Sequence, residues 1–267
     1  MKIGFIGCGN MGGALAFAIG STGAHEILLA DTNTEKAEAL AARIGAVVTD
    51  AEALASCADF LFLGVKPYGI RPLVASLSDA LKGNTTRTLV SMAAGVRVEA
   101  IENALATKNP VIRILPNTPV AVGKGMTVYT PSARVGVETE NAFVSLMTPT
   151  GAVDRIDESL IDAACAVAGC GPAFAYMFID ALAKGGERAG LSYDSAKRYA
   201  AEMVKGAAEM VLAQKKSPDT LREEVCSPGG STIEGVRSLW NDNFSDTVSR
   251  AVNASYHRTV ELGKPKE

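Results

Sequence analysis

Histidines and paired cysteines are scarce in this sequence, and their scarcity narrows the chemistry that the protein can carry out. The two histidines are His25, in a loop before an apolar run, and His257, near the C-terminus. The five cysteines lack CxxC spacing and are odd in number, so they indicate neither a disulfide framework nor a zinc site. We therefore expect no bound metal, no Ser/His/Asp or Cys/His catalytic arrangement, and a reducing, cytoplasmic location. The cysteines are Cys8, Cys57, Cys165, Cys170 and Cys226.

A surplus of positive charge is also missing, and glycine and proline interrupt the longer apolar runs. The formal net charge is −3, which offers no electrostatic footprint for nucleic acid. Residues 163–179 lack charge, but the glycines and proline at 169–172 would break a spanning helix, so a buried helix preceded by a loop is expected. The apolar run after Lys2 contains glycines at nucleotide-motif spacing, which opposes a signal peptide. We expect neither a nucleic-acid nor a membrane partner.

Short apolar runs alternate with helical periodicity in the first part of the chain, up to residue 156. The runs are rich in β-branched residues, and some are apolar throughout, which is typical of parallel strands buried on both faces. This alternation predicts an α/β fold with a Rossmann-type, doubly wound parallel sheet over residues 1–156. Strands are expected at 2–6, 26–30, 60–65, 88–92 and 111–115, and helices at 14–19, 34–44, 70–81 and 98–105.

The composition changes after residue 156, where alanine-rich helical segments replace the β-branched runs. Residues 157–267 are therefore predicted to form an all-helical second domain. This half is unusually apolar for its size, so we expect it to be buried against a second copy of the chain, as a homodimer, with a larger ring of dimers left open. Residues 263–267 are expected to be disordered. Helices are expected at 157–168, 172–189, 193–214, 218–225, 231–241 and 245–262.

A glycine-rich turn directly follows the first expected strand and opens the next helix. In that context the pattern Gly-x-Gly-x-x-Gly is typical of dinucleotide binding. Gly7 allows the tight turn, Gly9 lets a pyrophosphate approach the backbone, and Gly12 lets helix and strand pack closely. The alternative is three packing glycines in some other α/β fold. The cofactor-binding candidates in this turn are Gly7, Cys8, Gly9, Asn10, Met11 and Gly12.

Asp31 stands at the end of the second expected strand, where a dinucleotide fold places the acidic residue that contacts the adenosine ribose. A carboxylate there accepts hydrogen bonds from the ribose hydroxyls and repels a 2′-phosphate. The cofactor is therefore NADPH or NADH, with Asp31 leaning weakly towards NADH. Asn33, Thr34 and Lys36 follow closely and could reorganise around a phosphate, which keeps NADPH open.

Further loops follow other expected strands, at the edge where ligands of an open α/β sheet gather. The small residues at 93–95 could admit a nicotinamide ring, although a plain tight turn explains them equally well. Pro116 and Pro119 enclose Asn117 and Thr118 in a rigid polar loop, which as a bare turn would need no function. The cofactor-binding candidates in these loops are Val65, Lys66, Pro67, Ala93, Ala94, Gly95 and Asn117.

A second glycine-containing turn, at residues 227–232, precedes another expected helix. It places two glycines and hydroxyl side chains where free backbone N–H groups form a small anion site, suited to a carboxylate. The sequence thus predicts a redox cofactor but offers no evident side-chain acid or base. That combination suits a substrate that already carries its proton, such as a cyclic iminium ion.

Several short motifs occur together and in order along the chain. They are Ile3-Gly-Phe-Ile-Gly-Cys-Gly-Asn-Met-Gly12, Val65-Lys66-Pro67, Ala93-Ala94-Gly95, Leu115-Pro-Asn-Thr-Pro119, Gly171-Pro172-Ala173 and Ser227-Pro-Gly-Gly-Ser-Thr-Ile233. In this combination, which covers nearly the whole chain, the sequence resembles the pyrroline-5-carboxylate reductase family. The resemblance implies a Rossmann-type domain and a helical domain that interlocks with a partner subunit, with active sites shared across the dimer.

The resemblance also implies the reaction and the residues that serve it. Hydride passes from NAD(P)H to the C=N carbon of 1-pyrroline-5-carboxylate and gives L-proline, the last step of proline biosynthesis. The backbone around Ser227, Gly230 and Ser231 would hold the substrate carboxylate. Thr232 matches the threonine placed near the ring nitrogen and is the catalytic candidate. The substrate-binding candidates are Gly171, Pro172, Ser227, Gly229, Gly230, Ser231 and Thr232.

The chain departs from the family pattern at a few positions. Ala168 and Cys170 stand where the family usually has serines around Gly169, and Lys184 stands where an aspartate is common. These changes put hydrogen bonds near the substrate loop and a contact at the dimer seam in doubt. Two other functions stay open: a β-hydroxyacid dehydrogenase, which needs a catalytic lysine sooner after the glycine turn than Lys184, and a nucleotide-binding sensor without catalysis.

Overall fold

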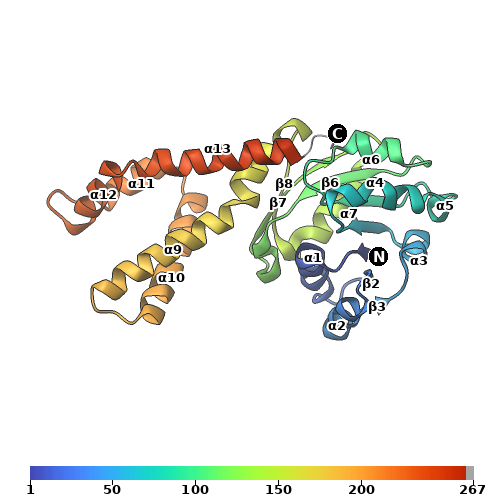
Figure 1. Ribbon diagram of the computed structural model, residues 1–267, viewed down its shortest axis with the longest axis horizontal. Coiled ribbons are helices and arrows are strands. Elements are labelled where there is room, and N and C mark those ends of the chain that lie inside the picture. Colours follow the sequence, from blue (N-terminus) through green and yellow to red (C-terminus); the bar gives the residue numbers. More distant parts are fainter. Residues whose placement is uncertain (263–267) are drawn as a thin grey trace. The chain divides into compact units, whose positions relative to one another are not determined.

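The computed structural model describes residues 1–262, so the tail at 263–267, expected to be disordered, lies outside the described residues. Contacts divide the chain into two compact units. The first comprises Met1–Cys170 together with the residues from Ser255 onward, and the second comprises Gly171–Ala254. Figure 1 shows that the first unit contains the sheet and that the second is built from helices.

An eight-stranded sheet forms the centre of the first unit, in the order β3-β2-β1-β4-β5-β6-β7-β8. The strands from β1 to β6 pair in parallel, which confirms the predicted doubly wound sheet. β7 runs antiparallel to β6, and β8 pairs in parallel with β7. β3, β7 and β8 were not predicted from the sequence. The strands are β1 (Lys2–Ile6), β2 (Glu26–Ala30), β3 (Val47–Val48), β4 (Phe60–Leu63), β5 (Thr88–Ser91), β6 (Val111–Leu115), β7 (Gly125–Pro131) and β8 (Gly151–Arg155).

Helices cover both faces of the sheet, which explains why strand β4 is apolar at every position. Phe60 and Phe62 point into one core cluster, while Leu61 and Leu63 point into the other. Side chains of α1, α2 and α7 complete the first cluster, and those of α3 to α6 complete the second. The helices are α1 (Asn10–Gly20), α2 (Thr34–Ile44), α3 (Ala51–Cys57), α4 (Pro67–Ser76), α5 (Ser78–Leu81), α6 (Val98–Ala104) and α7 (Val137–Met147).

Several short helical turns follow β8. A 3-10 turn at Glu158–Leu160 (η3) leads into α8 (Ile161–Ala164) and then into a π-helical turn at Cys165–Gly169 (η4). Ile161 and Ala166 are fully buried. Residues 157–170 therefore pack with the sheet, whereas composition assigns them to the helical half. The domain division after residue 156 stays a prediction.

The apolar stretch around residues 163–179 differs from its expected form. Among the described residues, Glu158–Arg188 is long and apolar enough to cross a membrane by length and composition alone. A π-helical turn takes the place of the expected loop. Only 6% of the most apolar window of this segment is buried, so the expected buried helix is wrong within a single chain.

The second unit exposes a large apolar surface. Helices α9 and α10 pack against each other through small residues, with Ala183, Ala196 and Ala200 buried. Most larger apolar side chains of this unit are exposed, including Met177 at 73% and Leu212 at 86%. Exposed large apolar side chains in this number are typical of a surface that another molecule covers. The helices are α9 (Gly171–Arg188), α10 (Tyr193–Ala213), α11 (Pro218–Glu224), α12 (Ser231–Asn241) and α13 (Phe244–Leu262), whose last residues belong to the first unit.

Candidate active site

The turn between β1 and α1 depends on glycine for steric reasons. Gly7 adopts a φ of 99°, and a Cβ added there would lie 2.6 Å from the carbonyl oxygen of Gly64. A Cβ on Gly12 would lie 2.1 Å from the carbonyl oxygen of Gly7. Both neighbours are backbone atoms, so no side-chain rotation relieves these contacts. Gly64, directly after β4, completes this close approach and was missed by the sequence analysis.

Gly9 is different, because the protein itself does not require a glycine there. Its φ is −67°, which any residue adopts, and a Cβ would meet no described atom within 4 Å. Gly9 caps α1 without a side-chain hydrogen bond, and the first turn of α1 holds no acidic residue. The exposed N–H groups of this turn therefore fit a phosphate that needs close access to the backbone. The residues present suit the dinucleotide predicted from the sequence.

Asp31 holds the glycine turn in place. One carboxylate oxygen accepts a hydrogen bond from the backbone N–H of Cys8 at 2.6 Å, and the other accepts one from Asn33 at 2.8 Å. Burial, with a smaller contribution from the Asp31 charge, raises the pKa of the Cys8 thiol to about 11. The thiol therefore stays neutral at physiological pH. Asp31 thus has a structural partner at Cys8 besides any contact with a ribose.

The other expected cofactor loops lie at the same edge of the sheet as the glycine turn. They follow the carboxyl ends of β4, which lies next to β1 in the sheet order, and of β5, which lies next to β4. Lys66 caps α4, which begins at Pro67, and Lys66 is exposed. Ala93 is buried, and Gly95 adopts a φ of 74°, so this turn needs glycine for its backbone. The structure therefore gathers Gly7 to Gly12, Asp31, Val65 to Pro67 and Ala93 to Gly95 at one edge.

Asn117 is only 8% exposed, and its side-chain amide is used within the first unit. Its Nδ2 donates to the carbonyl oxygen of Ala168 at 3.0 Å, and its Oδ1 accepts from the N–H of Met126 at 2.9 Å. The side chain thus links the end of β6 to β7 and to the π-helical turn. This is a structural use of a residue that we expected to contact the cofactor.

The expected carboxylate site lies in the second unit, at the start of α12. Ser227 to Gly230 form a turn closed by a 3.0 Å hydrogen bond from the N–H of Gly230 to the carbonyl oxygen of Ser227. Pro228 precedes Gly229, whose φ of 70° fits a type II turn. The turn leads directly into α12, whose N-terminus has no side-chain cap. Ser231 and Thr232, the first two residues of the helix, are exposed. Its first N–H groups and the Thr232 hydroxyl are therefore accessible to a small anion.

The residues that depart from the family pattern have local partners. Lys184 pairs with Asp180 one helical turn earlier, at 2.7 Å, and the Tyr193 hydroxyl donates to the same carboxylate at 2.8 Å. These hydrogen bonds, first from Lys184 and then from Tyr193, lower the pKa of Asp180. The N–H of Cys170 donates to the carbonyl oxygen of Cys165 and closes the π-helical turn just before Gly171 and Pro172 begin α9. Lys184 thus finds its counter-ion within its own helix.

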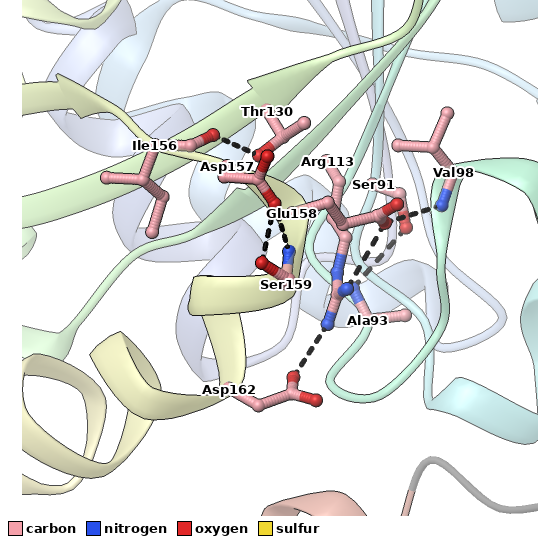
Figure 2. A network of polar contacts seen from close by, with 10 residues as sticks. All are labelled: Ser91, Ala93, Val98, Arg113, Thr130, Ile156, Asp157, Glu158, Ser159 and Asp162. Carbon is pink, nitrogen blue, oxygen red and sulfur yellow. Dashed lines mark hydrogen bonds and ion pairs between the residues drawn. The ribbon is translucent and has the colours of Figure 1, made fainter.

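The first unit contains a buried charge network that was not predicted from the sequence. The Arg113 side chain is 2% exposed and pairs with Glu158 at 3.2 Å and with Asp162 at 3.0 Å (Figure 2). Arg113 lies within an otherwise apolar strand that was predicted only as part of the core. Its partners, Glu158 and Asp162, come from a helical segment much later in the chain. A charged residue in an otherwise apolar strand is the signal that could have found it. Within residues 1–262, no group of three or more His, Cys, Asp or Glu side chains could hold a metal ion.

Comparisons with known proteins agree with this arrangement. Residues 158–262 match the family described as pyrroline-5-carboxylate reductase dimerisation, and residues 2–95 match the family described as NADP oxidoreductase, coenzyme F420-dependent. Pyrroline-5-carboxylate reductase of Aquifex aeolicus is 36% identical over 264 residues, covering 98% of this chain and 97% of that protein. The Escherichia coli enzyme of the same name is 35% identical, with 98% of each chain covered.

Solved structures give the same result. Pyrroline-5-carboxylate reductase of Coxiella burnetii superposes with a TM-score of 0.89 at 30% identity, covering 98% of both chains. The Plasmodium falciparum pyrroline carboxylate reductase, solved with NADP bound, superposes with a TM-score of 0.87 at 28% identity, covering 99% of this chain and 98% of that one. By its sequence over nearly its full length and by its fold, this chain belongs to the pyrroline-5-carboxylate reductase family.

Proposed function

We propose that this chain is an NAD(P)H-dependent oxidoreductase that reduces the imine bond of 1-pyrroline-5-carboxylate and forms L-proline, the last step of proline biosynthesis. The observation that carries the proposal is the paired set of anion sites. One helix start, at Gly9, is open to a phosphate, and another, at Gly230, is open to a small carboxylate. Membership of the reductase family accounts for both sites in one chain.

The chain's residues act mainly by binding and orienting. N–H groups at the start of α12 hold the substrate carboxylate, while the Thr232 hydroxyl hydrogen-bonds near the ring nitrogen. Glu234, the acidic residue in the first turn of α12, pairs with Arg237 at 2.5 Å, which reduces its repulsion of the anion. When bound, the reduced nicotinamide supplies the hydride. No side-chain acid is required, because the iminium form of the substrate already carries its proton.

Asp31 favours NADH over NADPH in this proposal. Its carboxylate directly follows β2, where it would repel a 2′-phosphate. The Asn33 side chain next to it accepts the N–H of Lys36 at 3.1 Å and caps α2, so its oxygen is already engaged. Oδ1 of Asp31 accepts hydrogen bonds from Thr32 and Asn33, whereas Oδ2 accepts one from Cys8, so the second lone pair of Oδ2 leaves room for a ribose hydroxyl. The family match to NADP oxidoreductases supports the nicotinamide cofactor in general.

Homodimerisation through the second unit is the assembly that we propose, with a larger ring of dimers as a further step. The exposed apolar surface of α9 to α13 supports it, as does the match to a dimerisation family. Glu158–Arg188 carries Asp180, Lys184, Glu187 and Arg188, which suit a protein interface better than lipid. We place the protein in the cytoplasm without a nucleic-acid or membrane partner. Light scattering of the purified chain tests the assembly.

A direct assay tests the activity. Absorbance of the reduced nicotinamide is followed with 1-pyrroline-5-carboxylate, separately with NADH and with NADPH. The proposal expects oxidation of the cofactor and formation of proline, with the higher kcat/KM for NADH. Failure of a folded protein to oxidise either cofactor would overturn the proposed reaction. A higher kcat/KM for NADPH would overturn the role given to Asp31 alone.

Replacing Thr232 with alanine is expected to lower kcat/KM by about 10-fold to 100-fold, because it removes a hydrogen bond to a charged substrate, worth roughly 1.5–3 kcal/mol. Thr232→Ser keeps a hydroxyl and should recover most of the loss. Ser238→Ala, an exposed change later on α12, serves as the matched control. Wild-type turnover and substrate affinity in Thr232→Ala would show that the hydroxyl does not orient the imine.

A further inference from the structure

Arg113 on β6 lies beside the cofactor edge of the sheet. Its backbone is in register with Ser91, the last residue of β5. The guanidinium is buried at 2% exposure, and two carboxylates, from Glu158 and Asp162, neutralise it. Nothing in the proposed reaction uses this network. Its position next to Ser91 raises the question of what it holds in place.

Glu158 does more than neutralise Arg113. The oxygen that pairs with Arg113, Oε1, also accepts a 2.8 Å hydrogen bond from the N–H of Val98, which is 60 residues away in sequence. Val98 is the first residue of α6, and Arg97 before it supplies no side-chain cap. Glu158 therefore takes the place of an N-cap for α6, and its negative charge suits the helix N-terminus.

Both ends of the loop between β5 and α6 are linked to Arg113, the start through its backbone and the end through its side chain and Glu158 (Figure 2). At its start, Ser91 pairs with the backbone of Arg113, and the Ser91 hydroxyl accepts the N–H of Ala93 at 3.4 Å. At its end, Val98 is held by Glu158, and Glu158 by the Arg113 side chain. The loop contains Ala93 to Gly95. Asp162, in contrast, contacts Arg113 and has no hydrogen bond to the loop among the described residues.

We propose that Glu158, oriented by Arg113, is a positioning residue that holds the Ala93 to Gly95 loop in the conformation that binds the nicotinamide cofactor. The inference rests on the proposed function, because it takes this loop as part of the cofactor site. The distinction between Glu158 and Asp162 makes it testable. Both carboxylates stabilise the buried guanidinium, but only Glu158 connects it to the loop.

The experiment compares Glu158→Ala with Asp162→Ala as the matched control. Both variants should lose thermal stability to a similar extent. Only Glu158→Ala should raise the Kd for NADH, measured by fluorescence titration below the Tm of every variant, by about tenfold, the effect of losing one hydrogen bond to a charged group. The KM for NADH should rise in parallel, with the KM for 1-pyrroline-5-carboxylate changing less than about twofold. Equal cofactor Kd values in the two variants would overturn the proposal.

If Glu158→Ala does not fold, the conservative variants Glu158→Gln and Glu158→Asp test the same role of Glu158. In Glu158→Gln the side-chain oxygen still reaches Val98, so the Kd for NADH should stay within about threefold of wild type. In Glu158→Asp the shorter side chain cannot reach both partners, and the Kd should rise more than in Glu158→Gln. The reverse order, or no difference, would overturn the proposal. A wild-type protein that binds NADH but does not reduce the imine would refute the proposed reaction while leaving this binding comparison valid.

Discussion

Replacing Gly12 with alanine is expected to lower cofactor affinity on the order of 100-fold, because displacement of a binding group by about 1 Å has effects of that size. The added Cβ would lie 2.1 Å from the carbonyl oxygen of Gly7, so the turn and α1 must move apart. That movement shifts the N–H groups expected to hold the pyrophosphate. Overpacking of this kind should also reduce the free energy of unfolding by roughly 1–3 kcal/mol. Fluorescence titration with NADH and urea unfolding measure the two effects.

The matched control for Gly12→Ala is Gly9→Ala in the same turn. Its Cβ meets no described atom within 4 Å, so the free energy of unfolding should change by less than about 0.5 kcal/mol. Cofactor affinity should nevertheless fall, because the new methyl group occupies space intended for the ligand. The two variants thus separate a glycine that the fold requires from one that the ligand requires. Wild-type affinity in Gly9→Ala would show that no ligand approaches this backbone closely.

Replacing Arg113 with methionine is expected to lower the free energy of unfolding by about 3 kcal/mol, at the lower end for a broken buried ion pair. The lower end applies because Glu158 and Asp162 are 25% and 28% exposed and keep some contact with water. The variant leaves two carboxylates close together without their cation. Urea unfolding at neutral pH measures the change.

The control for Arg113→Met is Arg155→Met, which removes a mostly exposed partner of Glu140. An exposed ion pair contributes less than about 1 kcal/mol, so this second loss should be small. An equal decrease in the free energy of unfolding in the two variants would mean that the buried Arg113 ion pairs stabilise the protein no more than an exposed ion pair does. A stability loss in Arg113→Met accompanied by weaker NADH binding would agree with the role inferred for Glu158.

Short sequence patterns predicted the elements whose formation depends on residues close together in the sequence. The parallel strands from β1 to β6, apart from the two-residue β3, were found because each forms an apolar run between helical segments. The strand β8 is half-exposed and polar at Asp154 and Arg155, so it lacked such a run. The helices α3 and α7 were also missed, and α3 spans only 7 residues. The antiparallel pairing of β7 with β6 depends on packing within the sheet, which the hydrophobic periodicity of the sequence does not indicate.

The candidate site divides in the same way. The glycine turn, Asp31 and the Ser227 to Thr232 turn follow from short motifs whose backbone demands are local. The close approach of Gly64 to Gly7 and the pairing of Arg113 with Glu158, 45 residues apart, depend on which strands lie side by side. For Asn117 the short motif predicted contact with the cofactor. In the structure its side-chain amide instead hydrogen-bonds to the backbone of Ala168 and Met126.

The small-residue packing of α9 against α10 has a consequence for how this protein folds. Ala183, Ala196 and Ala200 bury little area, so the helical unit gains little hydrophobic stabilisation by itself. Association in the homodimer that we propose adds to that stabilisation and links it to protein concentration by mass action. In the homodimer that we propose, dilution therefore lowers the stability of this half of the molecule, as a denaturant does.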